Sequence, residues 1–159
     1  LSKASKGRLP QWTPAMPQPL RPLAFAAAPA ASQPATDTAV TVVSSAGFDR
    51  AIAEAATGAA FGGGPILVDF TAAWCTVCKS NEVVMAAPEL RARLATLPQV
   101  TADVTNYDDA TRTLMERFRV VGPPALFLVD PQGREIAGSR IVGPVTVEEI
   151  TRRLDAAGA

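Results

Sequence analysis

Two cysteines three positions apart, Cys75 and Cys78, are the residues of this chain best suited to chemistry, and they are its only cysteines. They follow an apolar segment typical of a strand and lie where a helix is expected to begin. A helix N-terminus presents unpaired N–H groups and a partial positive charge, which favour a thiolate over a thiol. Two thiols at this spacing can form a disulfide with each other and open it again, so the motif predicts redox chemistry.

Other uses of the cysteine pair are weaker interpretations. A structural disulfide would close a four-residue loop, which contributes on the order of 2 kcal/mol at best from chain entropy. A zinc site needs about four ligands, and the sequence has no third cysteine and no histidine. We therefore expect redox activity without a metal or another cofactor. A non-enzymatic module stays open as an alternative, and insulin reduction that is lost on Cys75→Ser would exclude it.

Two acids flank the cysteines where they can influence proton transfer. Asp69 lies inside the apolar strand, where an unpaired carboxylate is costly, so its pKa should rise and it can accept a proton from Cys78. The alternative for Asp69 is a strand-end aspartate in contact with water. Glu82 lies one helical turn after Cys78, where its charge would oppose thiolate formation. The alternative for Glu82 is a solvated helix acid.

Composition indicates one ordinary domain with a tail. The hydrophobic fraction is 48% and the net charge is zero, which gives no sign of a nucleic-acid partner. No apolar run reaches the roughly 18 residues of a membrane span. The first 36 residues hold half of the fourteen prolines and four basic residues without an acid. We interpret residues 1–37 as a flexible linker or tail and residues 38–159 as the folded domain.

The pattern of the domain predicts an α/β fold with a mixed central sheet between two helical layers. Expected strands are 40–43, 66–70, 100–105 and 125–129, and the last of these should form a hairpin with a strand over 134–141. Expected helices begin after Ser44, at the cysteines, at Glu89, at Asp108 and at Thr146, which forms a capping box with Glu149.

The order of these features resembles thioredoxin. The resemblance rests on Trp74-Cys75-x-x-Cys78-Lys79 after a hydrophobic strand, followed by Gly122-Pro123-Pro124, a strand, a hairpin and a helix. A narrower resemblance over about residues 38–155 is to the C-terminal periplasmic domain of the DsbD family, bacterial transmembrane thiol:disulfide interchange proteins. It rests on Asp69, on Glu82 and on the segment Asp103-Val104-Thr105-Asn106.

The resemblance implies a site. Cys75 would attack a partner disulfide and Cys78 would resolve the mixed disulfide, with Asp69 buried beneath the pair and Glu82 modulating it. Trp74 would pack beside the site and shape docking, although a core role for it is also open. Pro124 would be the cis-proline that lines the partner groove.

The resemblance also implies a relay. The domain would receive electrons from a cysteine pair in a membrane-embedded domain and reduce the N-terminal domain of a DsbD-like protein. It would act as a monomer in the periplasm, tethered to the bacterial inner membrane. The alternative is a free-standing envelope reductase, such as one serving cytochrome c maturation; a span-rich segment upstream of Leu1 in the parent gene would distinguish the two.

The sequence departs from the thioredoxin pattern at two places, between the cysteines and before Pro124. Thr76 and Val77 stand between the cysteines where thioredoxin has Gly-Pro. Pro123 stands before Pro124, where the family normally offers a backbone N–H and C=O to an extended partner segment. Because proline has no N–H, one of those two bonds cannot form, and we expect a looser grip on partner peptides.

Overall fold

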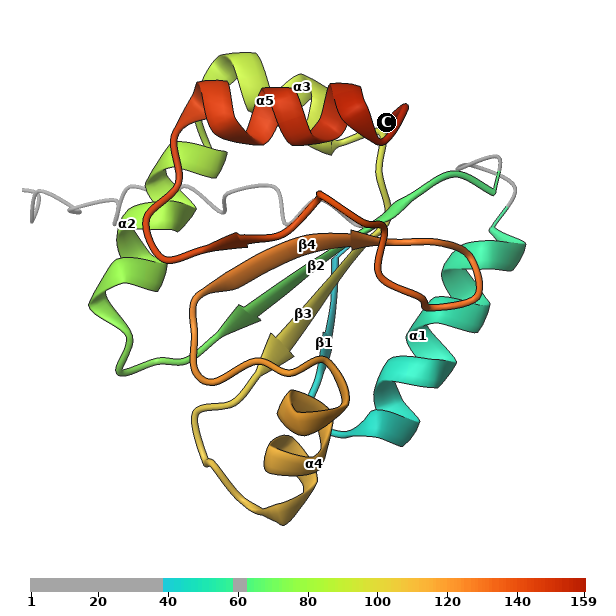
Figure 1. The fold of residues 1–159 in the computed structure, drawn as a ribbon, viewed down its shortest axis with the longest axis vertical. Coiled ribbons are helices and arrows are strands. Elements are labelled where there is room, and N and C mark those ends of the chain that lie inside the picture. Colours follow the sequence, from blue (N-terminus) through green and yellow to red (C-terminus); the bar gives the residue numbers. More distant parts are fainter. Residues whose placement is uncertain (1–38, 59–62) are drawn as a thin grey trace, which may run out of the picture. The chain divides into compact units, whose positions relative to one another are not determined.

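A five-stranded mixed sheet forms the centre of the domain in the computed structural model, which describes residues 39–58 and 63–159. The strand order is β1-β3-β2-β4-β5 (Figure 1). The strands are β1 (Ala39–Val42), β2 (Ile66–Thr71), β3 (Gln99–Asp103), β4 (Ala125–Val129) and β5 (Ile141–Val142). β1, β3 and β2 are parallel, whereas β4 runs antiparallel to β2 and to β5. The interpretation of residues 1–37 as a linker concerns residues outside the described ranges.

Helices cover both faces of the sheet, which confirms the predicted three-layer α/β architecture (Figure 1). On one face lie α1 (Ser45–Thr57) and α4 (Asp109–Arg117); on the other lie α2 (Thr76–Met85), α3 (Pro88–Leu94) and α5 (Val147–Ala156). Side chains alternate across β2, so Val68 and Phe70 pack in one core cluster and Leu67 packs in the other. β4 is buried along its whole length, as expected for a strand covered on both faces.

Polar side chains fix the ends of the helices. Ser44, Asp108 and Thr146 each accept a hydrogen bond from a backbone N–H in the first turn, at the N-termini of α1, α4 and α5. The reciprocal half of the predicted capping box is wrong, because the Glu149 side chain pairs instead with Arg152 and Arg153.

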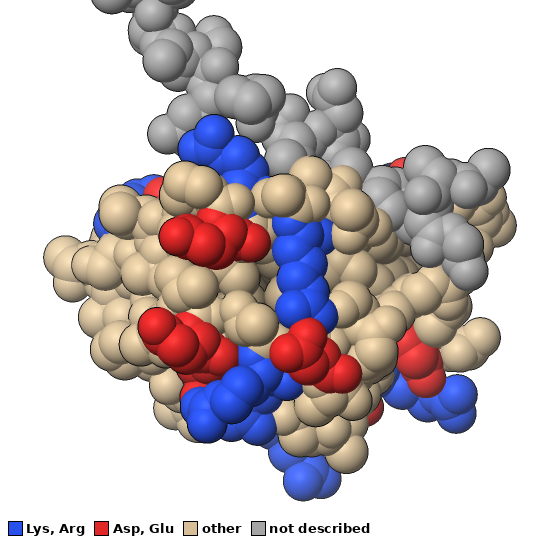
Figure 2. Space-filling model, turned by 90° about the horizontal axis from the view of Figure 1, so that it is seen from above, with Lys and Arg blue, Asp and Glu red and all other residues tan. Residues whose placement is uncertain are grey.

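The outer surface of α3 and α5 carries mixed charge. Arg93 on α3 pairs with Asp155 on α5 at 2.6 Å. Figure 2 views the domain from the side of these helices and shows acidic and basic side chains next to one another. This surface therefore presents no single-sign patch that would attract nucleic acid.

The predicted strand over 134–141 is largely wrong. Only Ile141 and Val142 form strand β5, and a single bridge joins Glu135 to Val129. Between them the Ser139 hydroxyl accepts a hydrogen bond from the N–H of Leu128 at 3.0 Å. The Ser139 side chain thus replaces one bond of the backbone ladder, beyond the bond from the N–H of Ile136 to the carbonyl of Leu128. Gly138 at a φ of +77° then turns the chain out of extended geometry.

Within residues 39–58 and 63–159, none of the helices has the length and apolar character needed to cross a bilayer.

A candidate dithiol active site

Cys75 and Cys78 are joined by a disulfide at the start of α2, with their Cα atoms 5.3 Å apart. Cys75 is the N-cap residue of the helix, and its Sγ accepts a hydrogen bond from the backbone N–H of Cys78 at 3.1 Å. Both cysteines belong to the core cluster, with exposures of 7% for Cys75 and 3% for Cys78. The difference in exposure between the two cysteines is therefore small, with Cys75 the more exposed.

The helix terminus gives Cys75 an environment suited to negative charge. When the disulfide opens, the N–H of Cys78 and the dipole of α2 both point at the sulfur of Cys75 and stabilise a thiolate there. Cys78 lies one turn further into the helix, so its sulfur is not at the helix N-terminus as that of Cys75 is. The pair is thus chemically asymmetric.

The loop before the cysteines is tied to the end of β3 through Thr105. The Thr105 hydroxyl accepts a hydrogen bond from the N–H of Ala73 at 2.9 Å, and its carbonyl accepts one from the indole Nε1 of Trp74 at 3.1 Å. Asp103 orients Thr105, because its carboxylate accepts hydrogen bonds from the backbone N–H and the hydroxyl of that residue. In the sequence, Asp103 and Thr105 stand out only as part of a resemblance, and nothing in their neighbours predicts this role.

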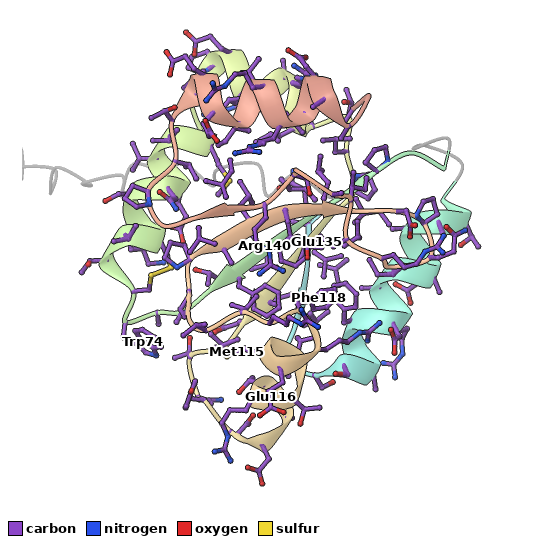
Figure 3. The ribbon with its side chains drawn as sticks, in the orientation of Figure 1. Trp74, Met115, Glu116, Phe118, Glu135 and Arg140 are labelled. Carbon is purple, nitrogen blue, oxygen red and sulfur yellow. A yellow bond between two sulfur atoms is a disulfide. The ribbon has the colours of Figure 1, made fainter. Side chains whose placement is uncertain are left out.

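Trp74 lies on the surface beside the disulfide. It is 58% exposed, so it is not a core residue. Figure 3 shows its ring projecting from the loop next to the yellow sulfur–sulfur bond. The hydrogen bond to Thr105 holds the indole in one orientation, which leaves a fixed aromatic surface at the edge of the site.

Asp69 lies on β2, the strand that leads into the cysteine loop, in register with Thr101 on β3 and Leu126 on β4, and its side chain is half-buried. Burial is the main cause that raises the pKa of its carboxyl from 3.8 to about 6, and the charge of Glu82 adds to the effect. Among the residues that the structure describes, no basic side chain forms an ion pair with Asp69. A carboxyl with this pKa can both accept and release a proton near neutral pH.

Glu82 lies on the outer side of α2. It forms an ion pair with Lys79, whose Nζ lies 3.0 Å from Oε1, and both side chains are about half exposed. The spacing within the helix predicts an effect of Glu82 on the thiols, which stays a prediction; in the structure its charge raises the pKa of Asp69. That coupling joins two elements and could not be read from the spacing within one helix.

The residues before β4 form the wall opposite the helix terminus. The peptide bond between Pro123 and Pro124 is cis. Phe70 is in register with Ala125, so Pro124 lies at the same end of the sheet as the segment that leads into the cysteines (Figure 1). Pro124 is buried and Pro123 is half-buried, whereas Val121 is 96% exposed.

The residues that the structure describes hold no group of three or more His, Cys, Asp or Glu side chains suited to a metal ion. The sulfur atoms of Cys75 and Cys78 are bonded to each other. The chemistry available at this site is therefore that of the disulfide and the carboxyl groups around it.

The sequence of this chain is similar to those of known thioredoxin-like proteins. A family model described as thioredoxin-like matches residues 46–131. Two thiol:disulfide interchange proteins of Pseudomonas aeruginosa, DsbD 1 and DsbD 2, are 34% and 36% identical over 67% and 80% of this chain. The matches cover only 18% and 22% of those proteins, so the chain spans about a fifth of the length of the curated relatives it matches.

Solved structures have the same fold. The reduced C-terminal domain of DsbD from Neisseria meningitidis superposes with a TM-score of 0.63 at 21% identity, covering 74% of this chain and 99% of that one. Thioredoxin NaTrxh from Nicotiana alata superposes with a TM-score of 0.57 at 25% identity, covering 76% of this chain and 92% of that one.

Proposed function

Because the chain belongs to the thioredoxin-like family, we propose that its domain is a protein-disulfide reductase that works by dithiol–disulfide exchange. The observation that carries the proposal is the disulfide between Cys75 and Cys78 at the N-terminus of α2, together with a carboxyl group of raised pKa on the preceding strand. A structural disulfide needs neither a helix dipole nor a nearby proton acceptor.

The reaction begins with the reduced pair. The thiolate of Cys75 attacks one sulfur of a partner disulfide, and a bond forms between Cys75 and that sulfur. The other partner sulfur leaves as a thiolate and takes up a proton. The N–H of Cys78 and the end of α2 stabilise Cys75 before the attack.

Cys78 completes the transfer. Its thiol gives its proton to the carboxylate of Asp69, and the resulting thiolate attacks Cys75. The bond between Cys75 and Cys78 forms, the mixed disulfide breaks, and the second partner sulfur leaves as a thiolate and is protonated. Two electrons have passed from the dithiol to the partner, and two protons accompany them. The reverse sequence oxidises the partner.

Trp74, Pro123 and Pro124 form the surface that receives the partner. The indole of Trp74 supplies a fixed apolar contact on one side of the sulfurs, and the Pro123–Pro124 segment supplies the other side. Pro123 offers a carbonyl to an extended partner chain but no N–H. Glu82 acts on the proton acceptor from the outer side of α2.

The partners of this domain are disulfide-bearing proteins, and we assign it to a DsbD-like relay. It receives electrons from a cysteine pair in a membrane-embedded domain and passes them to an N-terminal domain of the same protein. It works as a monomer in the periplasm, with residues 1–37 as the connection to the inner membrane, and needs no cofactor beyond its own disulfide. The identity of 34% and 36% to two DsbD proteins supports this assignment.

Insulin reduction with dithiothreitol as electron donor tests the activity. The wild-type chain should accelerate precipitation of the insulin B chain, and Cys75→Ser should reduce the rate to that of dithiothreitol alone. Ser80→Ala is the matched control, because Ser80 lies exposed on the same helix and bonds only to Thr76. A Cys75→Ser variant as active as the wild type would refute the proposed function.

A further inference from the structure

Asn81 is a buried polar residue on the cysteine helix, three positions after Cys78. It is 6% exposed. Its Nδ2 donates a hydrogen bond to the carbonyl of Gly143 at 3.0 Å, and its Oδ1 accepts one from the N–H of Val145 at 3.1 Å. The amide therefore joins α2 to the connection between β5 and α5, which runs beside α2 (Figure 1).

The same connection is bonded to the proline loop. The N–H of Gly143 donates a hydrogen bond to the carbonyl of Pro124 at 3.2 Å, and the neighbouring Val142 pairs with Ala125. Gly143 has a φ of +85°, a conformation that side chains rarely adopt. Gly143 is thus bonded to Asn81 through its carbonyl and to Pro124 through its N–H.

Asn81 is also the buried polar attachment of α2, beside the apolar contact of the partly buried Val77 with the first core cluster. Cys78 and Asn81 are the only buried residues of this helix, while Val84 and Met85 are partly buried against the second core cluster. Apolar contacts tolerate small sliding movements, whereas a buried amide with a donor and an acceptor both bonded has one favourable position. The position of the cysteine helix relative to Gly143 therefore depends on this side chain.

We propose that Asn81 is a positioning residue that sets the separation between the cysteine pair and the Pro124 loop, and through it the binding of extended partner segments. The inference rests on the proposed function, because only a disulfide exchange with a polypeptide uses both walls of the site. Attack on a small disulfide needs the sulfur of Cys75 but not the opposite wall.

The test compares two substrates. Asn81→Ala should raise the KM for insulin reduction about tenfold, because two buried hydrogen bonds are lost. The rate with the small disulfide 5,5′-dithiobis(2-nitrobenzoate) should stay within about twofold of the wild-type rate. Asn81→Ser leaves a hydroxyl too short to reach both partners, so it should also raise the insulin KM without changing the rate with the small disulfide. This variant replaces Asn81→Ala in the test if the alanine variant does not fold.

Ser139→Ala is the matched control. Ser139 is also buried, at 4% exposure, and its hydroxyl also bonds to backbone, but at Leu128 and Ile136 on the far part of β4 and its hairpin. Its loss should lower the melting temperature without changing the ratio of the two rates. A structural role for Asn81 would give the same behaviour as this control.

The outcomes are distinct. Folded Asn81 variants with an unchanged insulin KM, or with equal losses on both substrates, would overturn the inference. Rapid hydrogen exchange at the Val145 amide in the wild-type chain would overturn it without any variant, because that N–H should be protected by Asn81. A wild-type chain that reduces neither substrate would instead refute the proposed function.

Discussion

The charge of Glu82 on α2 reaches Asp69 on β2, and together with burial it raises the pKa of the Asp69 carboxyl to about 6. Glu82 is exposed and paired with Lys79, whereas Asp69 has no basic partner among the described residues. An exposed charge on the helix thus adds to the effect of burial on the Asp69 carboxyl. This relationship leads to predictions about stability and about catalysis.

Stability should depend on pH through Asp69. Its carboxyl ionises near pH 3.8 when unfolded and near pH 6 when folded, so the folded state holds the extra proton between these values. The free energy of unfolding of the oxidised wild type should therefore fall by about 2 to 3 kcal/mol as the pH rises from 4 to 7. Urea denaturation should show that Asp69→Asn lacks this fall.

Glu54→Gln is the control for that measurement. Glu54 is an exposed acid on α1, and its replacement removes the same charge without relieving burial. Wild-type and Asp69→Asn curves that stay parallel over this pH range would contradict the raised pKa.

Removing the charge of Glu82 should lower the pKa of Asp69. In Glu82→Gln only burial remains to raise that pKa, so the carboxyl resonance of Asp69 should titrate with a lower midpoint in a carbon-13 NMR experiment. The pH at which Cys78 resolves a mixed disulfide should shift in the same direction. Lys79→Met keeps Glu82 charged, and a midpoint that falls in this variant as far as in Glu82→Gln would argue against the coupling.

Replacing Cys78 should stop the reaction halfway. In Cys78→Ser the thiolate of Cys75 can still attack, but no second thiol can release the partner. A covalent adduct with a disulfide-bearing protein should therefore accumulate and be visible by mass spectrometry under non-reducing conditions. Cys75→Ser should form no such adduct. Adducts of equal yield in both variants would mean that the order of attack is wrong.

Pro123→Leu should tighten the mixed-disulfide complex with a peptide. Leucine restores a backbone N–H at the position where proline has none, and one added hydrogen bond is worth about 1 kcal/mol, or roughly fivefold in affinity. The change in affinity can be measured by competition between peptides for mixed-disulfide formation with Cys75, in the Cys78→Ser variant with and without Pro123→Leu. A small disulfide without a backbone provides the control, and unchanged or weaker peptide binding would refute the expectation.

The local signals in the sequence were sufficient for most of the fold. Ser44, Asp108 and Thr146 cap their helices where predicted, because N-cap chemistry depends only on residues within one turn. The continuous apolar run before the cysteines predicted a central strand, and β2 lies between β3 and β4. The cysteine pair was recognised because its spacing alone defines its chemistry.

Features that depend on distant partners were missed. The bonds of Asn81 reach residues 62 and 64 positions away, and nothing in its neighbours indicates them. The contact between Thr105 and the loop before the cysteines spans 32 positions. The strand expected over 134–141 failed for the same reason, since the N–H of Leu128 donates to the Ser139 side chain and not to a backbone carbonyl of that segment.

The outer strand β5 of the sheet is short. It has two residues, so its outer edge offers few free backbone groups to a strand from another molecule. A reductase of the kind proposed here meets other polypeptide chains. So brief an edge gives them little to pair with as an added strand, which lowers the risk of aggregation through this side of the sheet.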